Sequence, residues 1–268
     1  KIPKSLLKLD DPIFEFAKQI IDSTNKYAIA YKPNIAFFEA HGIQGYKSLE
    51  KISKYLNTNF PEIFTIADAK RGDIGNTSQM YAKAFLKDLD FDSITVSPYM
   101  GSDSVEPFLS FKNKYVFLLA LTSNKGSRDF QELIMNNSTK LFESVIRTSR
   151  RWKNSDKIMY VVGAKNTKEI GNIRKITPDS YILVPGIGAQ GGNLKEICKH
   201  GLDEDLKLIV NSSRSIIYAS DSSDFAQMAE NEAKKIQTEM EKYLNNIVWF
   251  ITQSLYLKIK MQNGLHLS

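Results

Sequence analysis

The segment Thr65-Ile66-Ala67-Asp68-Ala69-Lys70-Arg71-Gly72-Asp73-Ile74-Gly75-Asn76-Thr77 decides how the rest of the chain is interpreted. Apolar residues lead into it, charged residues then appear abruptly, and a glycine and a helix-starting Asn-Thr pair follow. Such a run is typical of a buried strand of a parallel sheet that ends in a functional site.

Three charged residues of this segment, Asp68, Lys70 and Asp73, lie close together in the sequence. Side chains alternate along a strand, so we expect Asp68 and Lys70 to share a face. Asp73 follows the glycine, and from a loop it can fold back or reach a neighbouring subunit. Because nearby carboxylates favour a charged lysine, we expect Lys70 to act as a cation and not as a nucleophile. An ordinary surface ion pair is the alternative, which the apolar residues before Asp68 disfavour.

The composition is that of a globular enzyme large enough to bury a sizeable core. The chain has 268 residues, of which 42% are hydrophobic and 25% charged, with a net charge of +6 and a pI near 9.1. A basic chain raises the possibility of nucleic-acid binding. The basic residues are spread along the chain, apart from the run Arg147-Thr148-Ser149-Arg150-Arg151, so we expect no nucleic-acid partner.

Cysteine usage and the chain ends bear on the compartment. The single Cys198 excludes an internal disulfide and fits a reducing compartment, so we expect a cytoplasmic protein. The first residues do not have the pattern of a signal peptide, so we expect none, and because the chain opens at Lys1 without a methionine we expect it to be processed, trimmed or incomplete. The apolar residues 247–268 are too few and too interrupted, by Gln253 and Lys258 for example, to span a membrane.

Apolar runs and amphipathic stretches alternate along the chain. The expected strands are Tyr27–Phe38, the strand of Asp68, Ser93–Pro98, Tyr115–Ser123, Ile158–Ala164, Tyr181–Pro185 and Leu206–Asn211. The expected helices are Pro12–Asn25 (capped by Asp10-Asp11), Gly45–Leu56, Thr77–Leu89, Val105–Phe111, Phe130–Trp152, Thr167–Ile176, one from Asn193, and Asp224–Leu244.

This alternation predicts an α/β fold in which helices cover a parallel sheet. About seven strands and eight helices, with a helix first, fit a (β/α)8 TIM barrel whose first strand is absent from this chain. A doubly wound open sheet is the alternative. We expect residues 1–246 to form the barrel domain and residues 247–268 to be a tail of unknown role.

Polar residues end two other predicted strands. Lys32 lies just before Pro33 and Asn34. Because a lysine is seldom buried without a partner, Lys32 is a candidate fourth charge beside Asp68, and a lysine reaching out to solvent is the alternative. Ser123 ends a second strand between Thr122 and Asn124, where the hydroxyl and amide groups suit the edge of a heterocycle or cap a helix.

Two late loops predict a phosphate site. The loop Pro185-Gly186-Ile187-Gly188-Ala189-Gln190-Gly191-Gly192 also matches a dinucleotide fingerprint, but the next strand ends in Asn211-Ser212-Ser213-Arg214 and lacks the acidic residue that such a fold needs. Backbone N–H groups of the glycine-rich loop, with Arg214 and Ser213 from the following loop, would instead bind a phosphate. TIM barrels often bind phosphate at their last two loops.

These residues resemble a known family. Ile66–Thr77, Ala30–Asn34 and Val184–Gln190 together resemble the orotidine 5'-phosphate decarboxylase family, from the first helix to about Ala219. The resemblance implies a homodimeric barrel enzyme that converts orotidine 5'-phosphate to UMP and carbon dioxide without a cofactor. No metal is expected, and the histidines are scattered.

The resemblance also implies roles for individual residues. Lys70 would be the proton donor and the cation that faces the carbanion at C6, Asp68 would lie by the substrate carboxylate, and Lys32 would bind ribose and hold Asp68. Asp73 would come from the partner subunit. The substrate-binding residues would be Asn34, Thr77 (from the partner subunit), Ser123 (pyrimidine), Pro185, Gln190 (phosphate), Ser213 and Arg214 (phosphate).

The chain departs from the family pattern at both ends. The family's first strand carries an aspartate that contacts ribose, and no residue before Lys1 is present to supply it; residues 247–268 do not resemble the family. Three alternatives stay open. They are a magnesium-dependent sugar-phosphate decarboxylase or aldolase of the same barrel type, a Schiff-base aldolase using Lys70 or Lys32, and a non-catalytic nucleotide-binding remnant.

Overall fold

The computed structural model describes residues 2–136, 138–187, 192–202 and 206–244. These residues form two compact units. Of the described residues, unit 1 comprises those in the ranges 2–69, 87–92 and 213–244, and unit 2 comprises those in the ranges 70–86 and 93–212. Strand β2 (Phe64–Arg71) runs from unit 1 into unit 2. The predicted tail, residues 247–268, lies outside the described residues.

Unit 1 is mainly helical. Besides the first part of β2, it contains η1 (Leu6–Lys8), α1 (Pro12–Thr24), η2 (Asn25–Tyr27), β1 (Ala30–Tyr31), α2 (Ile35–Glu39), α3 (Gly42–Asn59), α9 (Arg214–Ile217) and α10 (Phe225–Leu244). One face of α1 packs against α10, where Phe16 stacks on Phe225 with ring centroids 5.3 Å apart. The neighbouring face places Ile21 against Ile52 and Leu56 of α3. The predicted amphipathic first and last helices are therefore confirmed.

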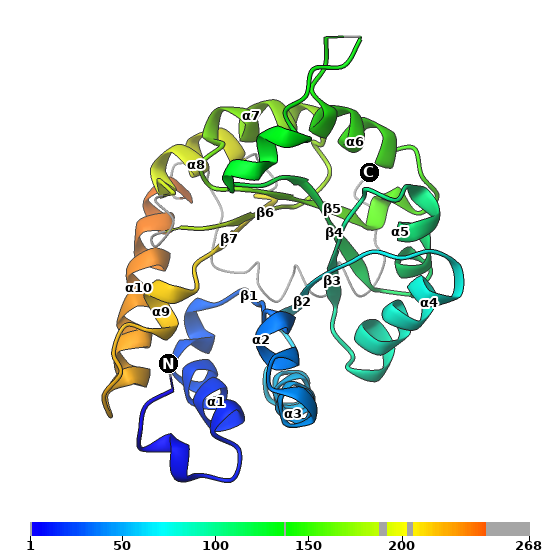
Figure 1. Cartoon of the computed structure of the whole chain (residues 1–268). Coiled ribbons are helices and arrows are strands. Elements are labelled where there is room, and N and C mark those ends of the chain that lie inside the picture. Colours follow the sequence, from blue (N-terminus) through cyan, green and yellow to red (C-terminus); the bar gives the residue numbers. More distant parts are fainter. Residues whose placement is uncertain (1, 137, 188–191, 203–205, 245–268) are drawn as a thin grey trace. The chain divides into compact units, whose positions relative to one another are not determined.

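Unit 2 alternates strands with helices. Its elements are α4 (Gly75–Lys83), β3 (Ser93–Val96), α5 (Ser102–Leu109), β4 (Tyr115–Leu121), η4 (Lys125–Asp129), α6 (Leu141–Ser149), η5 (Ser155–Lys157), β5 (Ile158–Val162), α7 (Thr167–Ile176), β6 (Ile182–Pro185), α8 (Leu194–Gly201) and β7 (Leu208–Asn211), and the π-helical turn η3 (Ala84–Asp88) leads from it into unit 1. Helices α5 to α8 follow one another along the outer side of β3 to β7 (Figure 1).

The strand order confirms the predicted fold class. The described strands form a seven-stranded sheet in which β1 to β7 follow the order of the sequence. The pairs β1–β2 and β3–β4 through β6–β7 are parallel. A doubly wound sheet reverses its strand order at a switch point, so this alternative is excluded. Sequential parallel strands alternating with helices are the topology of a TIM barrel with one strand fewer among the described residues.

The predicted strand Tyr27–Phe38 is wrong over most of its length, because only Ala30–Tyr31 is a strand. Pro33 has no backbone N–H to donate to a ladder. The side chain of Asn34 then accepts a hydrogen bond from the Ala36 N–H at 3.2 Å and caps helix α2. A helix cap therefore replaces the second half of the expected strand.

The predicted long helix Phe130–Trp152 is also wrong, because α6 covers only Leu141–Ser149. The residues before it form an isolated antiparallel bridge between Ile134 and Lys140, and Ser138 has a φ of +62°. Glu143 accepts a hydrogen bond from the Lys140 N–H at 3.2 Å, which starts the helix at that point.

Helix α3 begins at Gly42, before the predicted Gly45. Gly45 is an interior residue with a packing role, because a Cβ atom there would lie 1.9 Å from the carbonyl oxygen of Phe38. The short helix α2 can therefore lie directly against α3. The predicted helix Thr77–Leu89 corresponds to α4 and the π-helical turn η3.

Candidate active site

A buried ion pair in unit 1 links Lys32, which follows β1, to Asp68 of β2. The Nζ atom of Lys32 lies 2.6 Å from Oδ2 of Asp68, and the two side chains are only 10% and 9% exposed. The Asp68 N–H donates to the Pro33 carbonyl at 3.0 Å, and Asn34 forms an isolated parallel bridge with Asp68. Lys32 therefore does not reach out to solvent, and the predicted pairing with Asp68 is present.

Lys70 departs from regular strand geometry. It has a φ of +47°, in the left-handed region that a non-glycine residue adopts at a cost of about 1–3 kcal/mol. Its N–H donates to Oγ1 of Thr95 at 2.8 Å, and Thr95 is buried in β3 of the same unit. The alternation that predicted a shared face for Asp68 and Lys70 does not extend to Lys70. Sequence reasoning missed Thr95, although a hydroxyl in the apolar run Ser93–Val96 was a signal.

The loop after β2 holds Asp73. Its carboxylate accepts a hydrogen bond from the Ile74 N–H at 2.8 Å, and the side chain is half-buried. Thr77 lies in the first turns of α4 and is exposed. Arg71, the last residue of β2, packs its guanidinium against the rings of Tyr81 and Phe85, at 5.3 and 5.4 Å from the ring centroids. Arg71 thereby ties the start of this loop to α4 and η3.

The predicted phosphate residues lie in both units. In unit 2, Pro185 ends β6, and Gly186 has a φ of +102°. A Cβ atom at Gly192 would lie 2.5 Å from Cβ of Ala164, so only glycine fits there. Gln190 lies outside the described residues.

In unit 1, Ser213 precedes the four-residue helix α9, and Arg214 is its first residue. Both are exposed, and Ser123, which follows β4 in unit 2, is half-buried. The predicted site residues that the structure describes thus lie at strand ends, in the loops that follow them or in the first turn of the next helix, the regions where a TIM barrel carries its chemistry.

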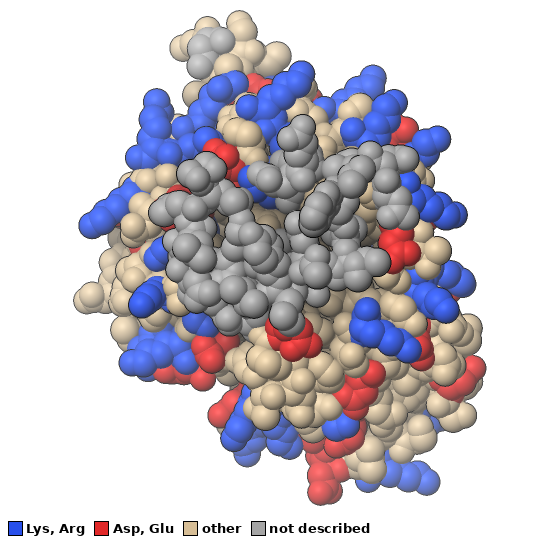
Figure 2. All heavy atoms as spheres, turned by 180° about the vertical axis from the view of Figure 1, so that it is seen from behind, with Lys and Arg blue, Asp and Glu red and all other residues tan. Residues whose placement is uncertain are grey.

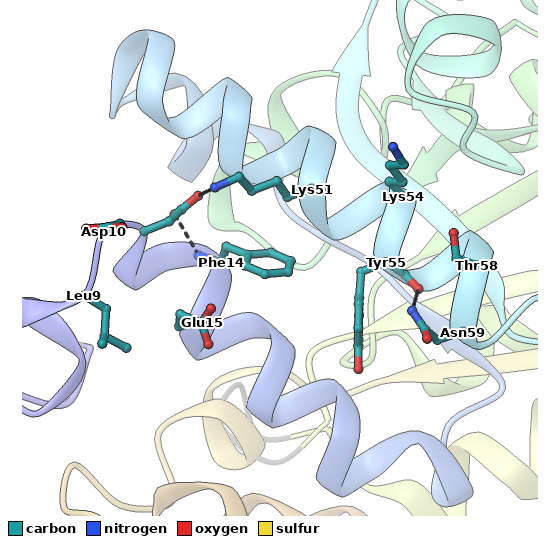
Figure 3. A pocket seen from close by; sticks show the side chains of 10 residues that line it. Leu9, Asp10, Phe14, Glu15, Lys51, Lys54, Tyr55, Thr58 and Asn59 are labelled. Carbon is teal, nitrogen blue, oxygen red and sulfur yellow. Dashed lines mark hydrogen bonds and ion pairs between the residues drawn. The ribbon is translucent and has the colours of Figure 1, made fainter.

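A groove of about 730 Å³ lies along α1 and α3 and contains none of the predicted site residues (Figure 3). Asp11 lines it and receives hydrogen bonds from Ser48 at 2.7 Å, Lys51 at 2.9 Å and the Phe14 N–H at 3.1 Å. Burial raises the pKa of the Asp11 carboxyl, but these three hydrogen bonds outweigh burial and hold the pKa below its ordinary value. Asp11 therefore joins the N-terminus of α1 to α3 as a charged cap.

Charge is dispersed over the face shown in Figure 2, where Asp and Glu lie among the Lys and Arg side chains. Within the described part of the chain, no helix is long and apolar enough to cross a membrane. Among the same described residues, no group of three or more His, Cys, Asp or Glu side chains is placed to hold a metal ion.

A family model described as orotidine 5'-phosphate decarboxylase / HUMPS family matches residues 6–229. The orotidine 5'-phosphate decarboxylase of Flavobacterium johnsoniae is 60% identical over 246 residues, which are 92% of this chain and 90% of that protein. The chain belongs to this family. A second relative, the orotidine 5'-phosphate decarboxylase of Christiangramia forsetii, is 57% identical over 247 residues, again 92% of this chain and 90% of that protein.

A solved structure of an orotidine 5'-phosphate decarboxylase family member agrees with the fold. The OMP decarboxylase of Leishmania donovani superimposes with a TM-score of 0.73 at 37% sequence identity, covering 84% of this chain and 88% of that chain. The family resemblance expected from the motifs is therefore confirmed.

Proposed function

We propose that this chain catalyses the decarboxylation of orotidine 5'-phosphate to UMP and carbon dioxide, the last step in making UMP. The observation that carries the proposal is the strand β2, which holds Asp68 and Lys70 and binds Lys32 through a buried 2.6 Å ion pair, in a chain of this family. A buried lysine–carboxylate pair provides fixed charges where the reaction develops charge.

The reaction breaks the bond between C6 of the pyrimidine and its carboxylate. Carbon dioxide leaves, the electron pair remains on C6, and a proton must then be added to C6. Lys70 is the proposed source of that proton, and its ammonium stabilises the carbanion before the transfer. The Thr95 hydrogen bond holds the Lys70 backbone in its left-handed conformation, which favours one position of the side chain.

Asp68 and Lys32 provide the remaining charges of the proposed reaction. Asp68 lies beside the substrate carboxylate, and Lys32 holds Asp68 and donates to the ribose. Because the Lys32 side chain is 10% exposed and already bonded to Asp68, it presents its remaining ammonium protons from a fixed position.

Substrate binding is assigned to polar residues at strand ends. Ser123 contacts the pyrimidine, Asn34 contacts the ribose side, and the phosphate binds at the two late loops. We assign substrate binding to Asn34, Thr77, Ser123, Pro185, Gln190, Ser213 and Arg214. Binding energy from the phosphate, which does not react, then serves to order the charged groups around C6.

We further propose a cytoplasmic homodimer with shared active sites, built on a barrel domain of residues 1–246. Asp73 and Thr77 are the residues that would serve the partner's site. Both follow β2 on a loop and a helix start, and Thr77 is exposed, which supports this assignment. No cofactor is part of the proposed reaction.

An ultraviolet assay of orotidine 5'-phosphate consumption, with and without a chelator, tests the function. We expect turnover that the chelator leaves unchanged, because side chains supply all the proposed charge stabilisation. A magnesium requirement with a sugar-phosphate substrate would instead favour the magnesium-dependent branch of this barrel type.

The Lys70→Ala variant tests the mechanism. We expect it to lose at least roughly three orders of magnitude in turnover, since charge stabilisation and proton transfer are lost together. UMP binding should decline much less. Lys235→Ala, at an exposed residue of α10, is the matched control and should retain full activity. If Lys70→Ala kept more than a few per cent of the activity, another group would be the proton donor.

A further inference from the structure

Ser123 lies just beyond β4, where the regular hydrogen-bond ladder of the sheet ends. The last pairing of this strand is Leu121 with Val162, and the Gly163 N–H still donates to the Leu121 carbonyl at 2.7 Å. The next residue, Thr122, needs other partners for its backbone groups. We infer that Gln131, Asn166 and Gly163 position Ser123 for the pyrimidine of the substrate, an inference that rests on the proposed function.

The side-chain amide of Gln131 replaces the missing strand partner on one side. Its Oε1 atom accepts the Thr122 N–H at 2.7 Å, and its Nε2 atom donates to Oγ1 of Thr122 at 3.0 Å. The Thr122 hydroxyl in turn donates to Oδ1 of Asn124 at 2.6 Å. These contacts hold the residues on both sides of Ser123.

Asn166 holds the other backbone group of Thr122. Its Nδ2 atom donates to the Thr122 carbonyl oxygen at 3.3 Å. Asn166 itself lies in the loop after β5, where its N–H donates to the Gly163 carbonyl at 3.0 Å. The peptide bond between Thr122 and Ser123 is therefore fixed by a side chain from the loop that follows the neighbouring strand.

Gly163 makes room for Ser123. A Cβ atom at Gly163 would lie 2.0 Å from Oγ and 2.7 Å from the backbone nitrogen of Ser123. Any other residue there would force Ser123 out of its place. Both the hydroxyl and the backbone of Ser123 thus lie directly against the end of β5.

Gln131 is itself held by its backbone. Its N–H donates to the Ser127 carbonyl at 2.8 Å, and its carbonyl accepts the Phe142 N–H at 3.0 Å at the start of α6. These two bonds fix the backbone from which the Gln131 side-chain amide extends, although Gln131 lies outside the regular strands and helices. These contacts make Gln131 a positioning residue, which acts on the base through Ser123.

The test compares two ligands that differ in the pyrimidine. Affinities of UMP and ribose 5-phosphate are measured as competitive inhibition of orotidine 5'-phosphate turnover. Gln131→Met removes the polar amide while keeping a similar shape. We expect this variant to bind UMP about tenfold more weakly, which is the effect of losing one or two hydrogen bonds. Its affinity for ribose 5-phosphate should not change. In a Ser123→Ala background, Gln131→Met should cause no further loss of UMP affinity, because the two residues act as one unit.

Asn166→Ala serves as a second test variant, and Tyr160→Phe serves as a control for loss of stability. Asn166→Ala should show the same selective loss, and it decides the question if Gln131→Met does not fold. Tyr160→Phe removes a buried hydroxyl that lies 2.9 Å from Ser149 in the same unit, so it should lower stability and change neither affinity.

Three results would overturn the inference. They are an equal loss of affinity for both ligands, an unchanged affinity for UMP, or a further loss of UMP affinity when Gln131→Met is added to Ser123→Ala. A wild-type chain that neither consumes orotidine 5'-phosphate nor binds UMP would instead remove the proposed function, and the inference with it.

Discussion

Replacing Lys32 by methionine would take an ammonium group away from the buried Asp68 carboxylate while keeping an unbranched side chain. The two charged atoms are 2.6 Å apart, and the side chains are 10% and 9% exposed. Breaking a buried ion pair by removing one partner costs about 3–5 kcal/mol, because the remaining charge is left uncompensated. Because some exposure remains and Asp68 has further interactions, we expect the lower end, about 3 kcal/mol.

The double variant separates stability from activity. Combining Lys32→Met with Asp68→Asn removes both charges, so it should recover most of the stability that Lys32→Met loses, with a coupling of about 2 kcal/mol. Turnover should not recover, because both charges belong to the proposed reaction. A stable and inactive double variant would show that the pair is retained for catalysis and not for folding.

The assay is urea unfolding at pH 7, in which the midpoint should shift without a change in slope. Lys26→Met is the matched control, since Lys26 also binds a carboxylate, that of Glu230 at 2.5 Å, but is 60% exposed. Surface pairs contribute little, so this control should behave like the wild type. The reasoning is refuted if Lys32→Met loses no more stability than Lys26→Met, or if the double variant loses the sum of the single losses.

Three further predictions concern the dimer, acid stability and a buried arginine. Inactive Lys70→Ala and Asp73→Ala proteins should regain roughly a quarter of wild-type activity on mixing, because random exchange gives about half heterodimers, each with one intact site; no recovery despite proven subunit exchange would place Asp73 in its own subunit's site. The pKa of Asp11 is lower in the folded state, so its stabilisation is present at neutral pH and is lost as the pH falls below about 4. Asp11→Asn should therefore lower the urea midpoint more at pH 7 than at pH 3, and an equal loss at both would exclude the charge as the cause. The Arg174 guanidinium donates to four carbonyl oxygens at 2.6–3.2 Å, so Arg174→Lys should cost at least about 2 kcal/mol in the same assay; a change under about 0.5 kcal/mol would show that water replaces those bonds.

The sheet could be predicted from sequence because its strands are short apolar runs between turn signals. The strand predicted at Ile158–Ala164 is observed at Ile158–Val162, and its residues are all buried. Such a strand has apolar side chains on both faces, so the pattern alone identifies it. The order of strands and helices then identified the barrel, because parallel neighbours need crossover helices.

Two elements could not be predicted because a local contact in each competes with the preference of the segment for a strand or a helix. The segment after Tyr31 has the apolar residues of a strand, yet the Asn34 cap diverts it into a helix. The segment before Leu141 has helix-forming residues, yet an isolated bridge between Ile134 and Lys140 holds it in another conformation. In both, one side-chain or bridge contact outweighs a weak intrinsic preference.

In the candidate site, too, one feature could be predicted from the sequence and another could not. The pairing of Lys32 with Asp68 was predicted because both residues lie at expected strand ends and because a lysine is seldom buried without a partner. The conformation of Lys70 does not follow from any such rule. The Lys70 N–H donates to the Thr95 hydroxyl on the next strand. The register between β2 and β3 decides whether such a hydroxyl lies opposite Lys70, which has the left-handed conformation. Gln131 and Thr122 repeat the arrangement at another strand end. Where a strand leaves its ladder to enter the site, its backbone needs a polar side chain from elsewhere in the fold, so isolated polar residues in apolar runs and loops are the places to search for positioning residues.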